Sequence, residues 1–185
     1  KNCYVVGVDA ENKSKDEIEV NSYIEFDLNK GLPDLNYNDF DYILLLDVIE
    51  HLKNPEKFMQ ILKNNIDKNP KVTVIISTAN IGFIVIRLML LFGSFNYGNR
   101  GILDKTHTRL FTFSSFKNLL LQTGFKITNI SGVPAPFPLV TGNNKIGKIL
   151  LKINKILIFL MENIFSYQIF SLIRPNTSVE LLLDQ

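Results

Sequence analysis

Residues 40–55 read FDYILLLDVIEHLKNP, and this stretch decides the fold. Its first part, residues 40–46, is a short apolar run with the length and composition of a strand buried on both faces. Asp47 closes the run. Asn54 and Pro55 then have the residue types of a helix N-cap and first turn. Apolar side chains follow at helical spacing, at Phe58, Leu62 and Ile66. The stretch therefore predicts a buried strand that is followed by a helix.

The rest of the chain repeats this alternation. Further strands are expected at residues 3–8, 22–26, 71–77, 125–130 and 167–173. Further helices are expected from residue 14, over 81–92, from a cap at Ser114 to a stop at Gly124, and over 145–165. Strands that alternate with helices predict a parallel sheet covered on both faces. We therefore expect one α/β domain over residues 1–185, with a doubly wound, mostly parallel sheet.

Composition and charge exclude several classes of protein. The net charge is +2, with lysines and carboxylates well mixed, so we expect no nucleic-acid partner. The single cysteine, Cys3, excludes an internal disulfide and fits a reducing compartment. The first residues lack a signal-peptide pattern, and no apolar run reaches the roughly 18 residues of a membrane span. These features predict a cytoplasmic protein.

Three predicted strands end in a carboxylate, at Asp9, Asp27 and Asp47. In an open parallel sheet, ligands bind beyond the carboxyl ends of the strands. A carboxylate there can accept both hydroxyls of a ribose or the amino group of an adenine. Aspartate is also common after strands as a turn former, which is the ordinary explanation for any one of them. Three such residues together favour a nucleotide-like ligand.

Residues 47–55, DVIEHLKNP, resemble the fourth-strand signature of class I S-adenosylmethionine-dependent methyltransferases, in the subgroup related to the ubiquinone-biosynthesis O-methyltransferases. Residues 77–80, STAN, and 101–112, GILDKTHTRLFT, match in the same order. The resemblance covers about residues 4–125, and the final strand also fits. It implies a Rossmann-like methyltransferase fold with a C-terminal antiparallel strand.

The resemblance also implies a binding site for S-adenosylmethionine. Asp9 would bind the ribose of this cofactor. Asp27 and Leu28 would lie against the adenine, and Leu46 and Asp47 would border the methionine part. No metal is implied.

Two histidines would lie near the pocket of the methyl acceptor, His51 and His107. An imidazole titrates near neutrality, so either could act as a general base. Structural alternatives have equal weight: His51 could bond backbone at the start of the helix, and His107 could order its loop with Asp104. Arg109 is interpreted as ordering the loop rather than contacting substrate.

The family carries a glycine-rich loop after its first strand, and this sequence shows none. Gly7 is followed by Val8 and Asp9, with no Gly-x-Gly. The first strand–loop–helix unit is therefore expected to be missing, which makes the domain N-terminally incomplete. Either residues upstream of Lys1 supply it, or the strand at residues 4–8 pairs directly with the strand at 42–46. In both cases we expect weak or absent cofactor binding by this chain alone.

Three functions remain open at this point. The first is methyl transfer to an unidentified small-molecule, lipid or saccharide acceptor. The second is a non-catalytic binding or scaffolding module that retains the fold. The third, a nicotinamide-dependent oxidoreductase, ranks last because it leaves the two histidine motifs unexplained.

The predicted helix at 145–165 suggests a further partner. Its lysines cluster on one face, at Lys145, Lys148, Lys152 and Lys155. A basic amphipathic helix can lie at a membrane surface, which would give a peripheral membrane contact. The preferred interpretation at this stage is a helix that packs on the core and exposes a solvated lysine face. The sequence does not set the oligomeric state.

Overall fold

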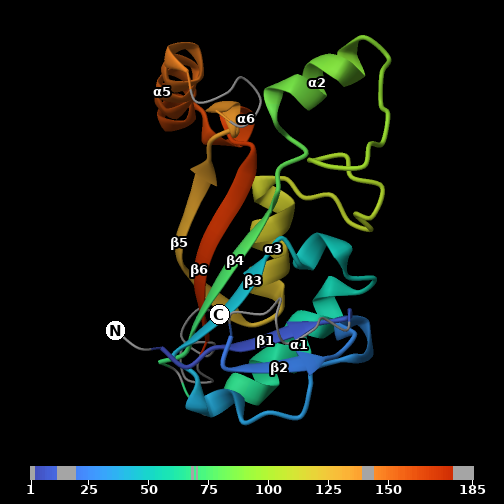
Figure 1. Ribbon diagram of the computed structural model, residues 1–185, viewed down its shortest axis with the longest axis vertical. Helices are drawn as coiled ribbons and strands as arrows, with labels where there is room; N and C mark the ends of the chain where they lie inside the picture. Colours follow the sequence, from blue (N-terminus) through green and yellow to red (C-terminus); the bar gives the residue numbers. More distant parts are fainter. Residues whose placement is uncertain (1–2, 12–19, 68, 70, 139–143, 177–185) are drawn as a thin grey trace.

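The strands form two separate sheets in the computed structural model, which describes residues 3–11, 20–67, 69, 71–138 and 144–176 (Figure 1). The smaller sheet pairs β1 (Val6–Asp9) with β2 (Ser22–Glu25) in parallel. The larger sheet has the order β3-β4-β6-β5. Its strands are β3 (Tyr42–Leu46), β4 (Thr73–Ala79), β6 (Gln168–Pro175) and β5 (Phe125–Val133). All the predicted strands in the described residues are present, and β5 and β6 extend further than expected.

The strand directions bring three strand ends to one edge of the larger sheet. β3 and β4 run parallel, and Leu46 is level with Ser77. β6 runs antiparallel to β4, so its first residue, Gln168, is level with Ala79 at the end of β4. The carboxyl ends of β3 and β4 therefore meet the amino end of β6. This confirms the expected C-terminal antiparallel strand.

The helices largely follow the sequence prediction. They are α1 (Pro55–Ile66), α2 (Ile84–Leu91), α3 (Phe113–Gln122), α5 (Lys145–Leu160) and α6 (Glu162–Phe165), with 3-10 turns η2 (Leu28–Lys30), η3 (Tyr37–Asp39) and η4 (Ile49–His51). Asn54 caps α1 as predicted, since its side chain accepts a hydrogen bond from the Lys57 backbone N at 2.9 Å. Gly124, at φ 86°, follows the end of α3, a backbone conformation that favours glycine.

Two helix predictions need correction. The N-cap of α3 is Thr112 and not Ser114, because Thr112 and Ser115 form a reciprocal capping box. The helix expected over 145–165 breaks at Met161, whose φ of −148° and ψ of 74° are not helical, so α5 and α6 are separate. The helix expected from residue 14 lies outside the described residues.

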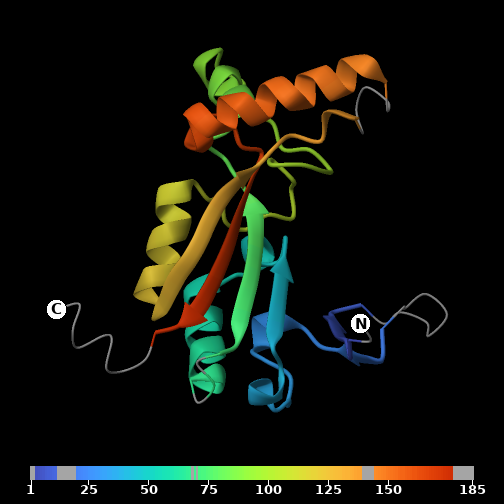
Figure 2. The ribbon, with the colours of Figure 1, turned by 90° about the vertical axis from the view of Figure 1, so that its left-hand side faces the viewer.

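The main core lies between the larger sheet and two helices, α1 and α3. Val74 and Ile76 of β4 are fully buried there, together with Leu62 of α1 and Phe116 of α3. Figure 2 looks onto the opposite face of the sheet, which α1 and α3 leave open.

The open face makes the prediction of double-sided burial wrong for β3. Alternate side chains of this strand are exposed, with Tyr42 at 60%, Leu44 at 57% and Leu46 at 50%. The reason is that β3 is an edge strand, and the described helices of the core cover only the face that carries Leu45.

The proposed direct pairing of residues 4–8 with β3 is also wrong. Among the described strands, β1 pairs only with β2, and β3 only with β4. The small sheet lies beyond the free edge of β3 (Figure 2). Within the described residues, no helix has both the length and the hydropathy that a membrane crossing requires.

Candidate functional site

Asp47 occupies the tip of β3 in an unusual backbone conformation. Its φ is 54°, the only positive value at a non-glycine position in the described part of the chain. Aspartate tolerates this region better than most residues, yet such conformations persist only where surrounding contacts hold them. Ser77 provides one contact, because its hydroxyl donates to Asp47 Oδ1 at 3.0 Å. Gln168 provides another, donating its side-chain amide to Oδ1 and Oδ2 at 2.9 Å each.

Glu50 lies three residues after Asp47 and is almost completely buried, with 2% of its surface exposed. Its Oε1 accepts a hydrogen bond from the Ala79 backbone N at 3.1 Å, and its Oε2 has no partner among the described residues. Burial raises the pKa of Glu50 above its ordinary value of 4.5, and the nearby charge of Asp47 acts in the same direction. Buried, incompletely paired carboxyls of this kind concentrate at functional sites.

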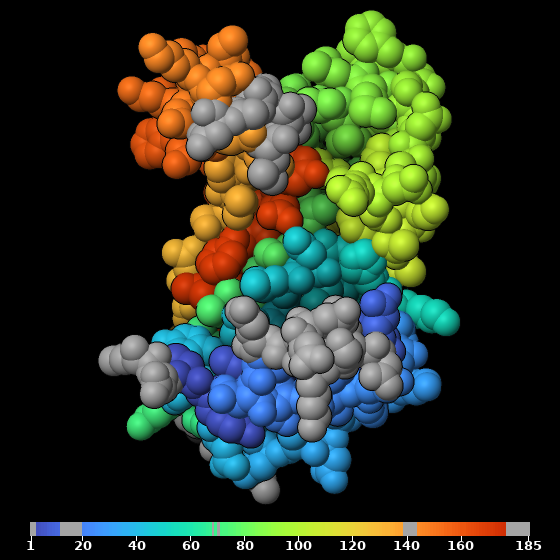
Figure 3. All heavy atoms as spheres, in the orientation of Figure 1, coloured from blue at the N-terminus to red at the C-terminus, as the bar shows by residue number. Residues whose placement is uncertain are grey.

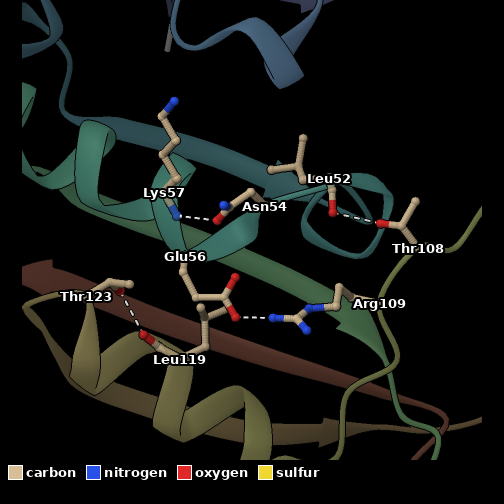
Figure 4. Close-up of polar contacts among 8 residues, drawn as sticks. All are labelled: Leu52, Asn54, Glu56, Lys57, Thr108, Arg109, Leu119 and Thr123. Carbon is tan, nitrogen blue, oxygen red and sulfur yellow. Dashed lines mark hydrogen bonds and ion pairs between the residues drawn. The ribbon is translucent and has the colours of Figure 1, made fainter.

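The loop that carries His107 is fastened to the start of α1. The backbone N atoms of Thr108 and Arg109 donate to the Glu50 backbone O, at 2.9 and 3.1 Å. The Thr108 hydroxyl donates to the Leu52 O at 2.7 Å, and the Arg109 guanidinium pairs with the Glu56 carboxylate of α1 (Figure 4). Arg109 therefore orders the loop, in agreement with the interpretation from sequence.

The fastened loop brings His107 against His51. The two ring centroids lie 4.8 Å apart in an edge-to-face arrangement. His51 Nδ1 lies 3.2 Å from the Thr106 O, and His107 Nδ1 lies 2.9 Å from the Ile102 O. A carbonyl oxygen only accepts, so each Nδ1 carries a proton, and in its neutral form each ring keeps a lone pair on Nε2. Each histidine thus bonds a backbone carbonyl of the loop through Nδ1, and Nε2 of each neutral ring could accept a proton.

Asp104 organises the same loop without bonding the His107 ring. Its Oδ1 accepts from the backbone N and the hydroxyl of Thr106, at 2.8 and 2.7 Å. These hydrogen bonds hold the pKa of Asp104 below its ordinary value of 3.8, and the charges of His107 and His51 contribute in the same direction. The suggested pairing of His107 with Asp104 is present only as a backbone contact, from His107 N to Asp104 O.

The predicted adenosine residues lie together at the end of the small sheet. Asp9 ends β1, and its Oδ1 accepts from the Glu11 backbone N at 3.2 Å. Asp27 caps η2 by accepting from the backbone N and the side-chain Nδ2 of Asn29, which holds its pKa below 3.8. Leu28 lines a small pocket between η2 and the start of α1. Asp27 thus shows the turn chemistry that is the ordinary explanation for an aspartate after a strand.

The structure therefore divides the predicted site residues into two groups. Asp9, Asp27 and Leu28 belong to the small sheet and the turn after it. The other four gather where β3 and β4 end, and they are Leu46, Asp47, His51 and His107. The two sheets do not share a strand pair among the described residues.

Sequence reasoning missed three residues at this edge, Glu50, Tyr167 and Gln168. Burial raises the pKa of Tyr167, and the charge of Asp47 adds to the effect. The Tyr167 ring packs edge-on against the Phe83 ring, with the two centroids 5.8 Å apart. Its hydroxyl lies close to Gly101, since a Cβ added at Gly101 would be 3.1 Å from the hydroxyl oxygen. An antiparallel last strand must begin at the edge where its parallel neighbours end. That signal could have identified Tyr167 and Gln168.

Comparisons with known proteins identify the family and the fold. A family model described as a methyltransferase domain matches residues 1–130. No curated protein sequence matches the chain significantly. The fold is similar to that of a SAM-dependent methyltransferase from Archaeoglobus fulgidus, with a TM-score of 0.55 and 15% identity over 92% of this chain and 75% of that one.

Two further solved structures show the same likeness. A methyltransferase of this type from Mesorhizobium loti has a TM-score of 0.56 and 14% identity, over 92% of this chain and 80% of that one. A possible histamine N-methyltransferase from Thermotoga maritima has a TM-score of 0.55 and 13% identity, over 91% and 72%. At these identities the likeness concerns the fold, and it confirms the Rossmann-like architecture.

Proposed function

The chain belongs to the methyltransferase domain family, and on this premise we propose that it transfers a methyl group from S-adenosylmethionine to a small-molecule, lipid or saccharide acceptor. The observation that carries the proposal is the histidine pair, His51 and His107, beside the ligand-binding edge of the sheet. Two imidazoles that each keep a lone pair on Nε2 are suited to receive a proton from an acceptor.

The residues at the edge fit the methionine part of the cofactor. Asp47 would take its amino group, because a carboxylate has about four acceptor positions and the contacts from Ser77 and Gln168 leave capacity. Leu46, half exposed at the end of β3, would border the same part.

The adenosine part would fall to the small sheet. Asp9 would accept the ribose hydroxyls, and Asp27 and Leu28 would border the adenine at the start of η2. Because the two groups belong to sheets that do not pair with each other, we expect cofactor binding to be weak. Binding energy depends on a preorganised site, and two sheets without shared hydrogen bonds supply little preorganisation.

When bound, S-adenosylmethionine supplies an activated methyl group on a sulfonium and departs as the thioether. The chain has to position the acceptor in line and exclude water. Asp47 and Gln168 would lie under the reacting groups at the strand ends, and the Tyr167 ring, which packs on the buried Phe83, would supply apolar surface next to them. His107 or His51 would remove the acceptor proton at Nε2.

The presence of a base also favours one kind of acceptor atom. A hydroxyl acceptor must lose a proton on methylation, which gives a base a task. This favours O-methyl transfer, in line with the resemblance to the ubiquinone-biosynthesis O-methyltransferases.

The experiment measures S-adenosylhomocysteine release from the chain with a panel of phenolic, lipid and saccharide acceptors at saturating cofactor. The proposal predicts acceptor-dependent release that falls in a His51→Gln variant and persists in Lys105→Gln, an exposed position on the loop that carries His107. Release that is absent with every acceptor class would favour the non-catalytic module. Equal release in both variants would reject the base assignment.

A further inference from the structure

The helix α5 carries an apolar stripe on its outer side. The side chains recur at helical spacing and are 48–67% exposed, at Ile146, Ile149, Ile153, Ile156 and Leu160. A helix of a globular protein usually turns such a stripe toward the core. Here the stripe faces away from the protein, which is the reverse of the core-packing helix preferred from sequence.

Two buried residues fix the rotation of α5. Asn154 is 5% exposed, and its side chain accepts from the Ala135 N at 3.0 Å and donates to the Phe165 O at 2.9 Å. Gly147 is buried two helical turns earlier on the same side. These contacts hold the Asn154 side against the protein, so the isoleucine stripe is presented outward.

The lysines of α5 form a second row next to this stripe. All are exposed, at Lys145, Lys148, Lys152 and Lys155. Residues 145–160 contain no aspartate or glutamate, so the row is uncompensated within the helix. Phe159, at 88% exposed, lies four residues after Lys155 in the lysine row, and Met161, at 52%, adds exposed apolar surface just after α5.

The helix α2 adds apolar surface at the same end of the molecule. Figures 1 and 2 both place α2 and α5 at the end opposite to the start of β4, and Figure 3 shows their atoms as two protrusions there. On α2 and just after it, Leu88 is 46% exposed, Leu91 75% and Phe92 83%. An exposed apolar surface on this scale marks an interaction site.

We propose that this end of the protein docks on an anionic lipid surface, with the isoleucine stripe of α5 in the acyl boundary and its lysine row at the headgroups. Apolar side chains beside basic ones on a single helix face fit a bilayer interface, where burial and charge attraction act together. A second copy fits less well, because a two-fold pairing of α5 helices would bring two lysine rows side by side. This surface does not depend on the methyl-transfer activity.

The sequence contains no tryptophan, so Phe159→Trp creates a single reporter on the proposed surface. Leu121→Trp is the matched control, since Leu121 is 48% exposed near the end of α3. α3 ends at the far end of the sheet from α5 (Figures 1 and 2). Vesicles of phosphatidylcholine and phosphatidylglycerol should shift the emission of the Phe159→Trp variant to shorter wavelength and leave the control emission unchanged. Equal shifts, or none, would overturn the proposal.

Co-sedimentation with the same vesicles tests the isoleucine stripe and the lysine row separately. Ile149→Gln with Ile153→Gln should lower the partition coefficient about tenfold or more, because both lose apolar burial. Lys148→Gln with Lys152→Gln should lower binding to anionic vesicles several-fold and have little effect on pure phosphatidylcholine. All four positions are exposed, so circular dichroism melts should match the parent chain.

Binding that survives both double changes would overturn the proposal. So would a two-chain particle, measured by light scattering, that becomes a single chain in the isoleucine variant without any vesicle binding by the parent. That result would assign the surface to a second copy.

Discussion

Gln168 donates its side-chain amide to both carboxylate oxygens of Asp47, at 2.9 Å each, although the two residues are 121 positions apart in the chain. The contact spans from β6 to the tip of β3, across β4, which lies between them in the sheet. It holds the Asp47 carboxylate at the carboxyl end of β3 while the backbone of Asp47 stays at a φ of 54°. β6, the last strand in the chain, thereby positions Asp47, the first residue of the motif at residues 47–55.

Replacing Gln168 tests this link. Gln168→Met keeps the length of the side chain and removes both donors, so it should lower the free energy of unfolding by about 0.5–1 kcal/mol, the value of a charged hydrogen bond reduced for exposure. Urea denaturation gives the measurement. Gln60→Met, at an exposed position of α1, is the control and should change stability less. Equal effects would show that the Asp47 contact contributes nothing.

His107 can be tested for two roles with two variants. His107→Ala should lower kcat about 100-fold or more, as expected for loss of a general base, and should affect cofactor affinity less. His107→Asn can still donate to the Ile102 O through its amide but offers no base at the Nε2 position. We expect both variants to be slow in the S-adenosylhomocysteine release assay. Recovery of activity in the asparagine variant would assign His107 to loop ordering alone.

The raised pKa of Glu50 predicts that the free energy of unfolding depends on pH. Because its pKa is raised in the folded chain, the folded state binds the Glu50 proton more tightly than the unfolded state. The stabilisation of the folded state that results is fully present below about pH 4.5 and is lost as the pH rises through the raised pKa of Glu50. Glu50→Gln cannot titrate, so the stability of the variant relative to the parent should increase with pH and then level off. Urea unfolding across the range from acid to neutral pH measures the difference, and a constant difference would contradict the assignment.

The cap of α3 provides a test of the local structure. Thr112→Ala removes the capping box and should lower the free energy of unfolding by about 1 kcal/mol. Ser114→Ala, at the position that the sequence pattern indicated, should change it by less than about 0.5 kcal/mol. The reverse order of the two effects would restore Ser114 as the cap.

Local patterns predicted the parts of the fold that depend on neighbours in the chain. Asn54 and Pro55 marked the start of α1, and the apolar runs marked the strands, because caps and strand composition act over a few residues. The exposed face of β3 was not predictable in this way. Tyr42, Leu44 and Leu46 have the composition of a doubly covered strand, but coverage depends on which distant elements pack there.

The candidate site shows the same division. His51 and His107 were identified from two motifs, and the structure brings their rings together. Gln168 was missed because its contact with Asp47 depends on the register of β6 against β4. Glu50 was missed as well, because its burial depends on the packing of η4 against the end of β4, where the Ala79 N donates to it.

S-adenosylmethionine would be held at the carboxyl ends of β3 and β4, next to the histidine pair. Titration of the ¹⁵N-labelled chain with the stable product S-adenosylhomocysteine, followed by NMR, tests this placement. We expect weak, fast-exchange binding, with a dissociation constant on the order of 0.1–1 mM, and amide shifts that concentrate at Asp47–His51 and Asp27–Leu28. Unchanged Asp47–His51 amides at millimolar ligand would contradict it.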